Sequence, residues 1–483
     1  MILAVFVARF FSTAVFFPSA DGDLAWQRWL GRTIRATARL PRTIGHETFT
    51  APGAAWVPQE WLFSIIASLS NGPGWYALAA ATAIAAASAL YLCAVRATRV
   101  PAAPLAVAAV LAFAGITMLG SFGVRAQVFA WPLLASFLYL IECGSPVAYG
   151  AIAVAVIWSN VHASVMLAGP LALIAALGSF LDDGWSARTR RTLIVGFGSL
   201  LATCCTPLGI DLPRYAVALF SSPFKDMITE WKHTDIGDAS FTFGALPLLL
   251  ALAAFGIGGS CRWRDRCIVL TTAFLMFSAT RNLPIFAIAC FPIVVRSICA
   301  SVPRFAKPAA LPVTRADAYI ARFMPAFSLI LAVFVGYALV VQSRAQDVPS
   351  DDLQQALGVV RALPGTQNVF CADFAWCSFL IGTERTRIFL DGRADPYPQS
   401  VWDDFAAIVR VRPGWDRTLR ARGTDVVVVG VTSPLEQALE LGHDWRSRYH
   451  NDLYRIWTRL PPAADLRALA PASGSRRRPQ EGM

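Results

Sequence analysis

The residues best suited to chemistry lie in the segment 18–60, which follows the first apolar run of the chain. Asp21 and Asp23 come directly after that run, so both carboxylates are expected at a membrane surface. Four arginines follow on one face of a predicted helix that runs to about residue 39, at spacings of four, three and four: Arg28, Arg32, Arg35 and Arg39. A carboxylate can take a proton from an attacking hydroxyl, and a cation can stabilise a phosphate leaving group. The segment therefore has the residue types needed for group transfer.

The predicted helix carries apolar residues on a different arc, where Trp26, Trp29, Leu30 and Ile34 lie. An amphipathic helix of this kind is typical of a membrane interface, with its arginines directed at lipid phosphates. Two interpretations stay open. The helix is a general interfacial anchor, or one or two of its arginines hold the phosphate of a lipid-linked substrate.

The composition excludes an ordinary soluble enzyme. Hydrophobic residues make up 56% and charged residues only 15% of 483, and the mean hydropathy is +0.51. The net charge of +11 is attributed to topology and lipid contact, and nothing resembles a nucleic-acid-binding module. We predict a polytopic α-helical membrane protein with about eleven spans. These lie near 1–17, 73–95, 101–121, 126–142, 147–160, 163–181, 192–209, 243–258, 267–280, 283–300 and 321–342.

The short loops predict the orientation, because Lys and Arg favour the cytoplasmic side. Loops of one parity hold most of the arginines: Arg96, Arg99, Arg188, Arg190, Arg191, Arg262, Arg264 and Arg266. With that side cytoplasmic, the first outer loop (18–60), the second outer loop (210–242) and everything after Ser343 face outward. In a bacterium this describes a multi-pass protein of the inner (cytoplasmic) membrane with a periplasmic C-terminal part.

Three regions follow from this pattern. Residues 1–343 form the membrane domain, 344–460 a small periplasmic α/β domain, and 461–483 a disordered tail. In the α/β domain, strands are predicted at 368–370, 387–390, 426–429 and 453–457, with helices at 351–363, 402–409, 415–422 and 434–441.

Two features of the α/β domain predict covalent or ionic links. Cys371 and Cys377 are its only cysteines and lie in an oxidising compartment, so a disulfide is expected, the alternative being two small buried thiols. The turn from Asp391 to Asp395 alternates charges and predicts an ion-paired loop. Its expected purpose is structural, with acceptor binding as the alternative. No cysteine or histidine pattern predicts a structural zinc site.

Several motifs together resemble a known family. They are Asp21-Gly-Asp-Leu-Ala-Trp-Gln-Arg-Trp-Leu-Gly31, Leu40-Pro-Arg-Thr43, Phe49-Thr-Ala-Pro-Gly53, Trp56-Val-Pro-Gln-Glu-Trp-Leu62, Arg125-Ala-Gln127, Trp158-Ser-Asn-Val-His162, Thr229-Glu-Trp231, Arg281-Asn-Leu-Pro284 and Asp391-Gly-Arg-Ala-Asp395. In this order they resemble the GT-C superfamily, and most closely its bacterial protein-mannosyltransferase-like and lipid A glycosyltransferase-like members. The resemblance implies transfer of a hexose or pentose from a polyprenyl-phosphate donor to a cell-envelope acceptor, which is a lipid, a glycan or a protein, with inversion at the anomeric carbon.

The resemblance also implies roles for individual residues. The carboxylate that activates or orients the acceptor maps onto Asp23, with Asp21 as the alternate. The expected substrate-binding residues are Arg28, Gln27, Gln59, Glu60, Arg125, His162 and Arg281. Where close relatives usually have histidine, this chain has Gln27 and Gln59, which puts a divalent metal and, to some extent, catalytic competence in doubt.

Other residues of the motifs have two interpretations each. His162 with Asn160 is either a polar helix-end pair or a catalytic group, and Arg281 either binds the donor phosphate or reaches to the interface. The segment around Glu230, with Lys232 and His233, either closes over the site or is a solvated loop.

Two other function classes remain. A non-catalytic assembly protein on the same scaffold fits the two glutamine replacements. A transporter fits less well, because few charges fall at mid-span and no internal repeat is evident.

Overall fold

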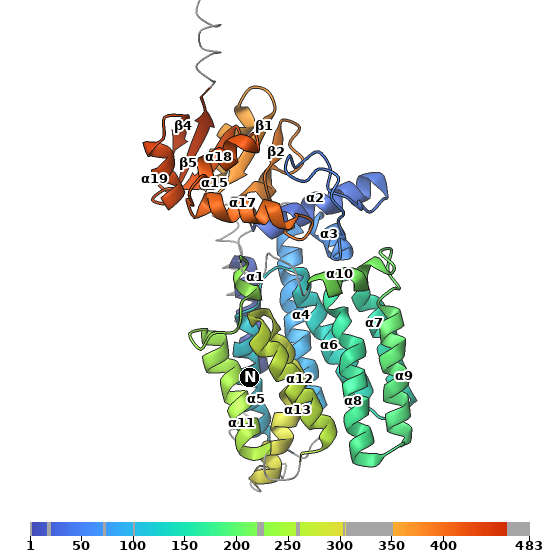
Figure 1. The fold of residues 1–483 in the computed structure, drawn as a ribbon. Helices are drawn as coiled ribbons and strands as arrows, with labels where there is room; N and C mark the ends of the chain where they lie inside the picture. Colours follow the sequence, from blue (N-terminus) through green and yellow to red (C-terminus); the bar gives the residue numbers. More distant parts are fainter. Residues whose placement is uncertain are drawn as a thin grey trace, which may run out of the picture.

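A computed structural model describes residues 2–16, 21–70, 74–99, 102–219, 227–256, 261–302, 305 and 351–460. Helices form a bundle, and a small sheet domain (351–460) lies at one end of it together with both outer loops (Figure 1). The predicted span 321–342 and the predicted tail 461–483 lie outside the described residues.

The bundle is built from apolar helices and short turns of 3-10 or π-helix. Their bounds are α1 Ile2–Phe16, α4 Gly74–Ala97, α5 Pro104–Leu119, α6 Ala126–Glu142, η1 Pro146–Tyr149, α7 Gly150–Ser159, η2 Ala163–Leu167, α8 Ala168–Asp183, α9 Ala187–Ala202, η5 Phe241–Ala245, α11 Leu246–Gly256, α12 Trp263–Ser278, η6 Thr280–Asn282 and α13 Leu283–Ser301. The second outer loop contributes α10 Asp211–Leu219 and η4 Thr229–Trp231. Each predicted span before residue 302 overlaps one or two of these elements.

The chain is a multi-pass membrane protein by the length and composition of its helices. In the part that the structure describes, three helical stretches are long and apolar enough to cross a bilayer: Gly74–Ala97, Ala163–Asp183 and Thr280–Ser301. Five shorter apolar helices accompany them. The count of about eleven spans stays a prediction.

The first outer loop folds into helices α2 (Gly22–Thr37) and α3 (Trp61–Ala67), which pack against each other. Helix α2 lies between the bundle and the sheet domain (Figure 1). At Gly22 a side chain would overlap the backbone of Ala375, so glycine allows the start of α2 to touch the sheet domain.

The sheet domain contains five strands and covering helices. Its elements are α15 Asp351–Ala362, β1 Gln367–Cys371, α16 Phe374–Cys377, η8 Ser378–Leu380, β2 Thr386–Ile388, α17 Gln399–Val409, α18 Trp415–Ala421, β3 Val426–Gly430, α19 Pro434–Leu441, β4 Trp445–His450 and β5 Tyr454–Arg459. The strand order is β2-β1-β3-β5-β4, with β1 parallel to β2 and β3, and β5 antiparallel to β3 and β4. Strand β4 is absent from the sequence-based prediction.

The central strand β3 is buried on both faces, as its continuous valine run predicts. Val426 and Val428 face α15, whereas Val427 and Val429 join a second core with α17 and the first outer loop. This second core corrects one expectation. The apolar arc of α2, with Leu30 and Ile34, packs on the sheet domain instead of lying in lipid.

The first outer loop also pairs with the edge of the sheet. The Ile388 amide donates to the Glu47 carbonyl at 2.8 Å, and the Phe49 amide donates back to Ile388 at 3.3 Å. The Thr48 hydroxyl donates to the same Ile388 carbonyl at 2.9 Å. The first outer loop therefore covers the open edge of β2 and attaches the sheet domain to this loop.

Candidate active site

A cavity of about 800 Å³ lies where the bundle, both outer loops and the sheet domain meet. Its polar lining comes from all four parts and includes Asp21, Asp23, Gln27, Gln59, Glu60, Arg125, Gln127, His162, Ser164, Tyr215, Glu230, Arg281, Asp373, Arg393 and Asp395. A cavity of this size fits a sugar and the head group of a lipid. Of the predicted substrate-binding residues, all except Arg28 line it.

Arg125, which directly precedes α6, gathers three carboxylates. Its guanidinium lies 3.4 Å from Asp21 Oδ2 and 3.5 Å from Asp23 Oδ2, and it forms an ion pair with Glu230. Burial alone would raise the pKa of Glu230, but Arg125 and then Arg281 hold it below its ordinary value. Glu230 thus belongs to the site, and the solvated-loop interpretation is wrong for this residue.

Asp21 and Asp23 have different environments. Asp21 is the N-cap of α2, and its Oδ1 accepts hydrogen bonds from the amides of Asp23 at 2.8 Å and Leu24 at 3.3 Å. Asp23, by contrast, lies within the first turn of the helix. Its side chain is 38% exposed to the cavity, and Arg125 is the one cation paired with it among the described residues.

The surroundings of Asp23 shift the pKa of its carboxylate. Desolvation by the protein atoms around the cavity raises the pKa of Asp23 to about 7; Arg125 opposes the shift, and the negative charges of Asp21, Glu230 and Glu60 add to it. A carboxylate with this pKa is a far better proton acceptor near neutral pH than an exposed aspartate.

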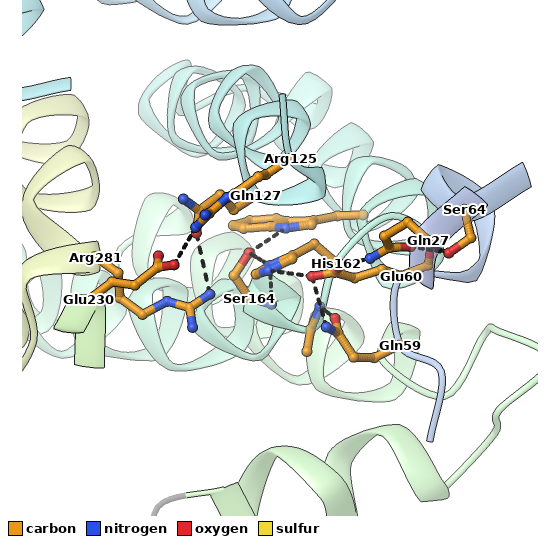
Figure 2. Close-up of polar contacts among 12 residues, drawn as sticks. Gln27, Gln59, Glu60, Ser64, Arg125, Gln127, His162, Ser164, Glu230 and Arg281 are labelled. Atoms are coloured by element: carbon orange, nitrogen blue, oxygen red, sulfur yellow. Dashed lines mark hydrogen bonds and ion pairs between the residues drawn. The ribbon is translucent and has the colours of Figure 1, made fainter. Parts of the chain in front are cut away.

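Glu60 is the centre of a second polar cluster, drawn in Figure 2. Its Oε1 accepts a hydrogen bond from Gln59 Nε2 at 2.9 Å and lies 3.4 Å from His162 Nε2, while Oε2 accepts from Gln27 Nε2. Gln27 Oε1 in turn accepts from the Ser64 hydroxyl. Gln27 and Gln59 therefore hold a carboxylate in place.

His162 is a neutral member of this cluster. Its Nδ1 accepts a hydrogen bond from the Ser164 amide at 3.0 Å, so Nε2 carries the proton and faces Glu60. Burial and then Arg281 lower the pKa of His162 to about 3. Asn160 instead donates to the backbone of Val156 at 2.8 Å. The predicted pair thus separates: His162 lies in the cavity, and Asn160 stabilises a helix end.

Arg281 lines the cavity in a different way from Arg125. Its Nη2 donates to Gln127 Oε1 at 3.3 Å, and its guanidinium lies 4.2 Å from the centroid of the Trp231 ring. Within the described residues no carboxylate lies at ion-pair distance from it. Its positive charge is therefore available to an anion in the cavity.

Arg28 lies outside the cavity lining. Its guanidinium donates to Ser70 Oγ and to the Ser70 carbonyl, each at 3.0 Å, and lies 5.7 Å from the centroid of the Trp75 ring. Arg32, Arg35 and Arg39 on the same face are exposed. Contact of this arginine face with lipid phosphates stays a prediction.

The turn after β2 forms part of the cavity wall, through Gly392, Arg393, Ala394 and Asp395. The Arg393 guanidinium is fully buried, pairs with Asp391 at 2.6 Å and Glu47 at 2.8 Å, and lies over the rings of Trp29 and Trp56. The turn is an ion-paired loop, as predicted, and it links the sheet domain to the first outer loop.

Asp395 belongs to the same wall but was not predicted as a site residue. Burial, followed by the nearby Glu60 charge, raises its pKa well above the ordinary value. Only its charge alternation with Arg393 was visible in the sequence, and the closeness of Glu60 depends on the packing of two domains.

Cys371 and Cys377 are joined by a disulfide, with their Cα atoms 5.8 Å apart. The residues 372–375 between them line the cavity next to Asp21 and Gly22. The disulfide thus closes the short loop that forms this part of the wall.

Three carboxylates of the cavity are arranged around a cation. Asp21, Asp23 and Glu230 converge on the Arg125 guanidinium. In the ranges that the structure describes, no group of three or more His, Cys, Asp or Glu side chains is placed to hold a metal ion.

Comparison with protein-family models and with curated protein sequences finds no match. Among solved structures, the archaeal oligosaccharyltransferase AglB from Archaeoglobus fulgidus, in complex with an inhibitory peptide and a dolichol-phosphate, matches with a TM-score of 0.54 and 11% identity. The match covers 89% of this chain and 69% of that one. The apo form of the Archaeoglobus fulgidus oligosaccharyltransferase matches with a TM-score of 0.50 and 12% identity over the same shares.

A further match is ArnT from Cupriavidus metallidurans bound to undecaprenyl phosphate, at 13% identity over 95% of this chain and 98% of that one. Its TM-score of 0.47 is too low to support an argument. The two oligosaccharyltransferase matches show a shared fold. The fold that the motif resemblance leads us to expect is therefore one that this chain shares with these oligosaccharyltransferases.

Proposed function

We propose that this chain, which has the fold of the GT-C membrane glycosyltransferases, transfers a sugar from a polyprenyl-phosphate donor to an acceptor bound in the cavity. We place the reaction at the periplasmic face of a bacterial inner membrane. One observation carries the proposal. A single cavity holds a partly exposed carboxylate, Asp23, and a cation without a carboxylate partner among the described residues, Arg281.

Asp23 acts as the general base in this mechanism. An acceptor hydroxyl attacks the anomeric carbon and gives its proton to Asp23, while the bond from that carbon to the phosphate oxygen breaks. Polyprenyl phosphate leaves with the electron pair, and the configuration inverts. Asp21 is engaged as a helix cap and serves to place α2, so it is the weaker candidate for the base.

Arg281 binds the donor phosphate and stabilises the negative charge that grows on it. Arg125 already balances Asp21, Asp23 and Glu230, and its main work is to hold these carboxylates together by offsetting their mutual repulsion. That AglB was solved with a dolichol-phosphate supports a lipid phosphate as the ligand of this fold.

The cluster around Glu60 forms a rigid part of the cavity and orients the acceptor. Since Gln27, Gln59 and His162 all direct N–H groups at Glu60, its oxygens are largely engaged and it is a poorer base than Asp23. We propose that the reaction needs no divalent metal, because a guanidinium occupies the centre of the other carboxylate cluster. The acceptor is a lipid, a glycan or a protein of the cell envelope.

The test uses the full-length protein purified and reconstituted in vesicles with a radiolabelled polyprenyl-phosphate sugar and a cell-envelope extract as acceptor. We expect label to move from the lipid to the acceptor, and Asp23→Asn to lower the rate of transfer by about 10² to 10⁴. Asp235→Asn, which changes an exposed carboxylate of the second outer loop, is the matched control and keeps activity. Binding of the donor lipid without any consumption by the parental protein would favour the non-catalytic assembly protein instead.

A further inference from the structure

Gly392, in the turn that follows β2, touches the carboxylate that we assign as the base. A Cβ atom built on Gly392 would lie 3.0 Å from Asp23 Oδ1, 3.0 Å from Ser378 Oγ and 3.1 Å from Trp26 Cδ1. Such contacts are tighter than ordinary van der Waals distances. The backbone φ of Gly392 is not in the left-handed region, so lack of space explains the glycine here.

We propose that Gly392 is a positioning residue of the transfer reaction, through which the sheet domain sets the place and the solvation of the Asp23 carboxylate. The inference rests on the proposed function, since it assigns a purpose to a contact with the proposed base. The sheet domain then takes part in the reaction by positioning the base, a role that the sequence motifs do not assign to it.

The turn is firmly held, so it acts as a fixed surface. The Gly392 amide donates to Ser378 Oγ at 2.9 Å, and Ser378 itself is only 2% exposed. The two chain neighbours of Gly392, Asp391 and Arg393, have fully buried side chains that pair with each other at 2.6 Å. Asp23, at 38% exposed, is the neighbour with room to move. A methyl group added at Gly392 would therefore displace the Asp23 carboxylate.

The displacement has an electrostatic consequence as well. The charged groups that face Asp23 come from several elements: Arg125, Asp21, Glu230 and Glu60, with Asp373 and Asp395 of the sheet domain lining the same cavity. A methyl group beside the carboxylate excludes water from it and raises its pKa further above about 7. Because the ionised form is the base, activity then needs a higher pH.

The first experiment compares Gly392→Ala with Gly358→Ala. Gly358 lies in α15 of the same domain, and nothing lies within 4 Å of a Cβ built there, so its variant controls for the substitution itself. We expect Gly392→Ala to lower kcat about tenfold with little change in KM for the donor lipid, and to move the acid limb of the pH profile upward. Parental kcat and an unmoved limb in Gly392→Ala would overturn the inference.

Two further variants separate positioning from general damage to the fold. In an Asp23→Asn background, Gly392→Ala should cause no further loss of residual transfer, and an additive loss would contradict an effect through Asp23. In a Gly392→Ala background, Ser378→Ala removes one of the crowding atoms and should restore part of kcat. The double variant also provides a test if Gly392→Ala alone fails to accumulate. In that case, a kcat of the double variant no higher than that of Asp23→Asn would refute the positioning role of Gly392.

A measurement that needs no transfer keeps the two proposals apart. Carbodiimides modify protonated carboxyl groups, so the extent of Asp23 labelling against pH, read by mass spectrometry, gives its titration midpoint. We expect the midpoint to be higher in Gly392→Ala than in the parental and Gly358→Ala proteins. A higher midpoint with no donor consumed in any protein supports the contact and refutes the proposed function. An unchanged midpoint in an active protein refutes the positioning role alone.

Discussion

Replacing Asp23 by asparagine tests the chemistry most directly. With a pKa of about 7, half of the Asp23 side chains are ionised at pH 7, about a tenth at pH 6 and about nine tenths at pH 8. The parental kcat/KM should therefore rise nearly tenfold from pH 6 to pH 8 and then level off. Asparagine keeps the shape but accepts no proton. We expect Asp23→Asn to lower kcat by about 10² to 10⁴ and to remove the acid limb of the profile.

The neighbouring variant Asp21→Asn is the matched control. Asparagine caps a helix nearly as well as aspartate, so α2 should remain folded. Removing the Asp21 charge takes away one of the influences that raise the pKa of Asp23, and the acid limb should move to lower pH while activity persists. Transfer is measured with the labelled donor between pH 5 and 9. An Asp23→Asn protein that retains the parental rate and its acid limb would refute the assignment.

Four further predictions follow from the contacts of the site. Arg393→Ala leaves Asp391 buried without its cation and should cost about 3–5 kcal/mol of stability, measured as a lower Tm in detergent. The control Arg387→Ala, on the exposed side of β2, should leave Tm unchanged. The bond between Cys371 and Cys377 should leave both unlabelled by a thiol reagent in the unfolded, unreduced protein, and its reduction should cost about 2 kcal/mol. Arg281→Ala should raise KM for the donor at least tenfold, and Arg281→Lys should raise it less; an unchanged KM in both would remove the arginine from phosphate binding. Transfer should survive incubation with EDTA, and loss of activity that Mg²⁺ or Mn²⁺ restores would show that a metal takes part.

Much of the fold was predictable because hydrophobic runs report burial directly. The valine run of β3 and the long apolar helices needed no knowledge of the tertiary structure. Strand β4 was missed because its sequence, Trp-Arg-Ser-Arg-Tyr-His, is largely exposed at the sheet edge and lacks an apolar alternation. The apolar arc of α2 was also wrongly assigned to lipid, whereas it packs on the sheet domain. Lipid and a protein core both favour apolar residues, so the sequence does not distinguish them.

The candidate site was predictable in its residues but not in their pairing. Motifs pointed to Asp21, Asp23 and Arg125, yet the ion pair between Arg125 and Glu230 joins residues 105 positions apart. The contact of Gly392 with Asp23 depends on the docking of two domains, which no local pattern encodes. The sequence also leaves open which aspartate caps α2, because either Asp21 or Asp23 could fill that position. The structure assigns the cap to Asp21.

The pairing of the first outer loop with strand β2 bears on how the protein is made. The Thr48 hydroxyl and the Ile388 carbonyl that it contacts are 340 residues apart in the chain. At roughly 5–20 residues per second, a ribosome needs about 20 to 70 s to synthesise that interval. Until then the loop lacks the sheet edge with which it pairs, so the cavity that both of them line can be completed only after the sheet domain has been translated. With the orientation proposed above, the loop that bears the aspartates is exposed to periplasmic proteases until then, and a chain truncated before the sheet domain lacks the complete cavity.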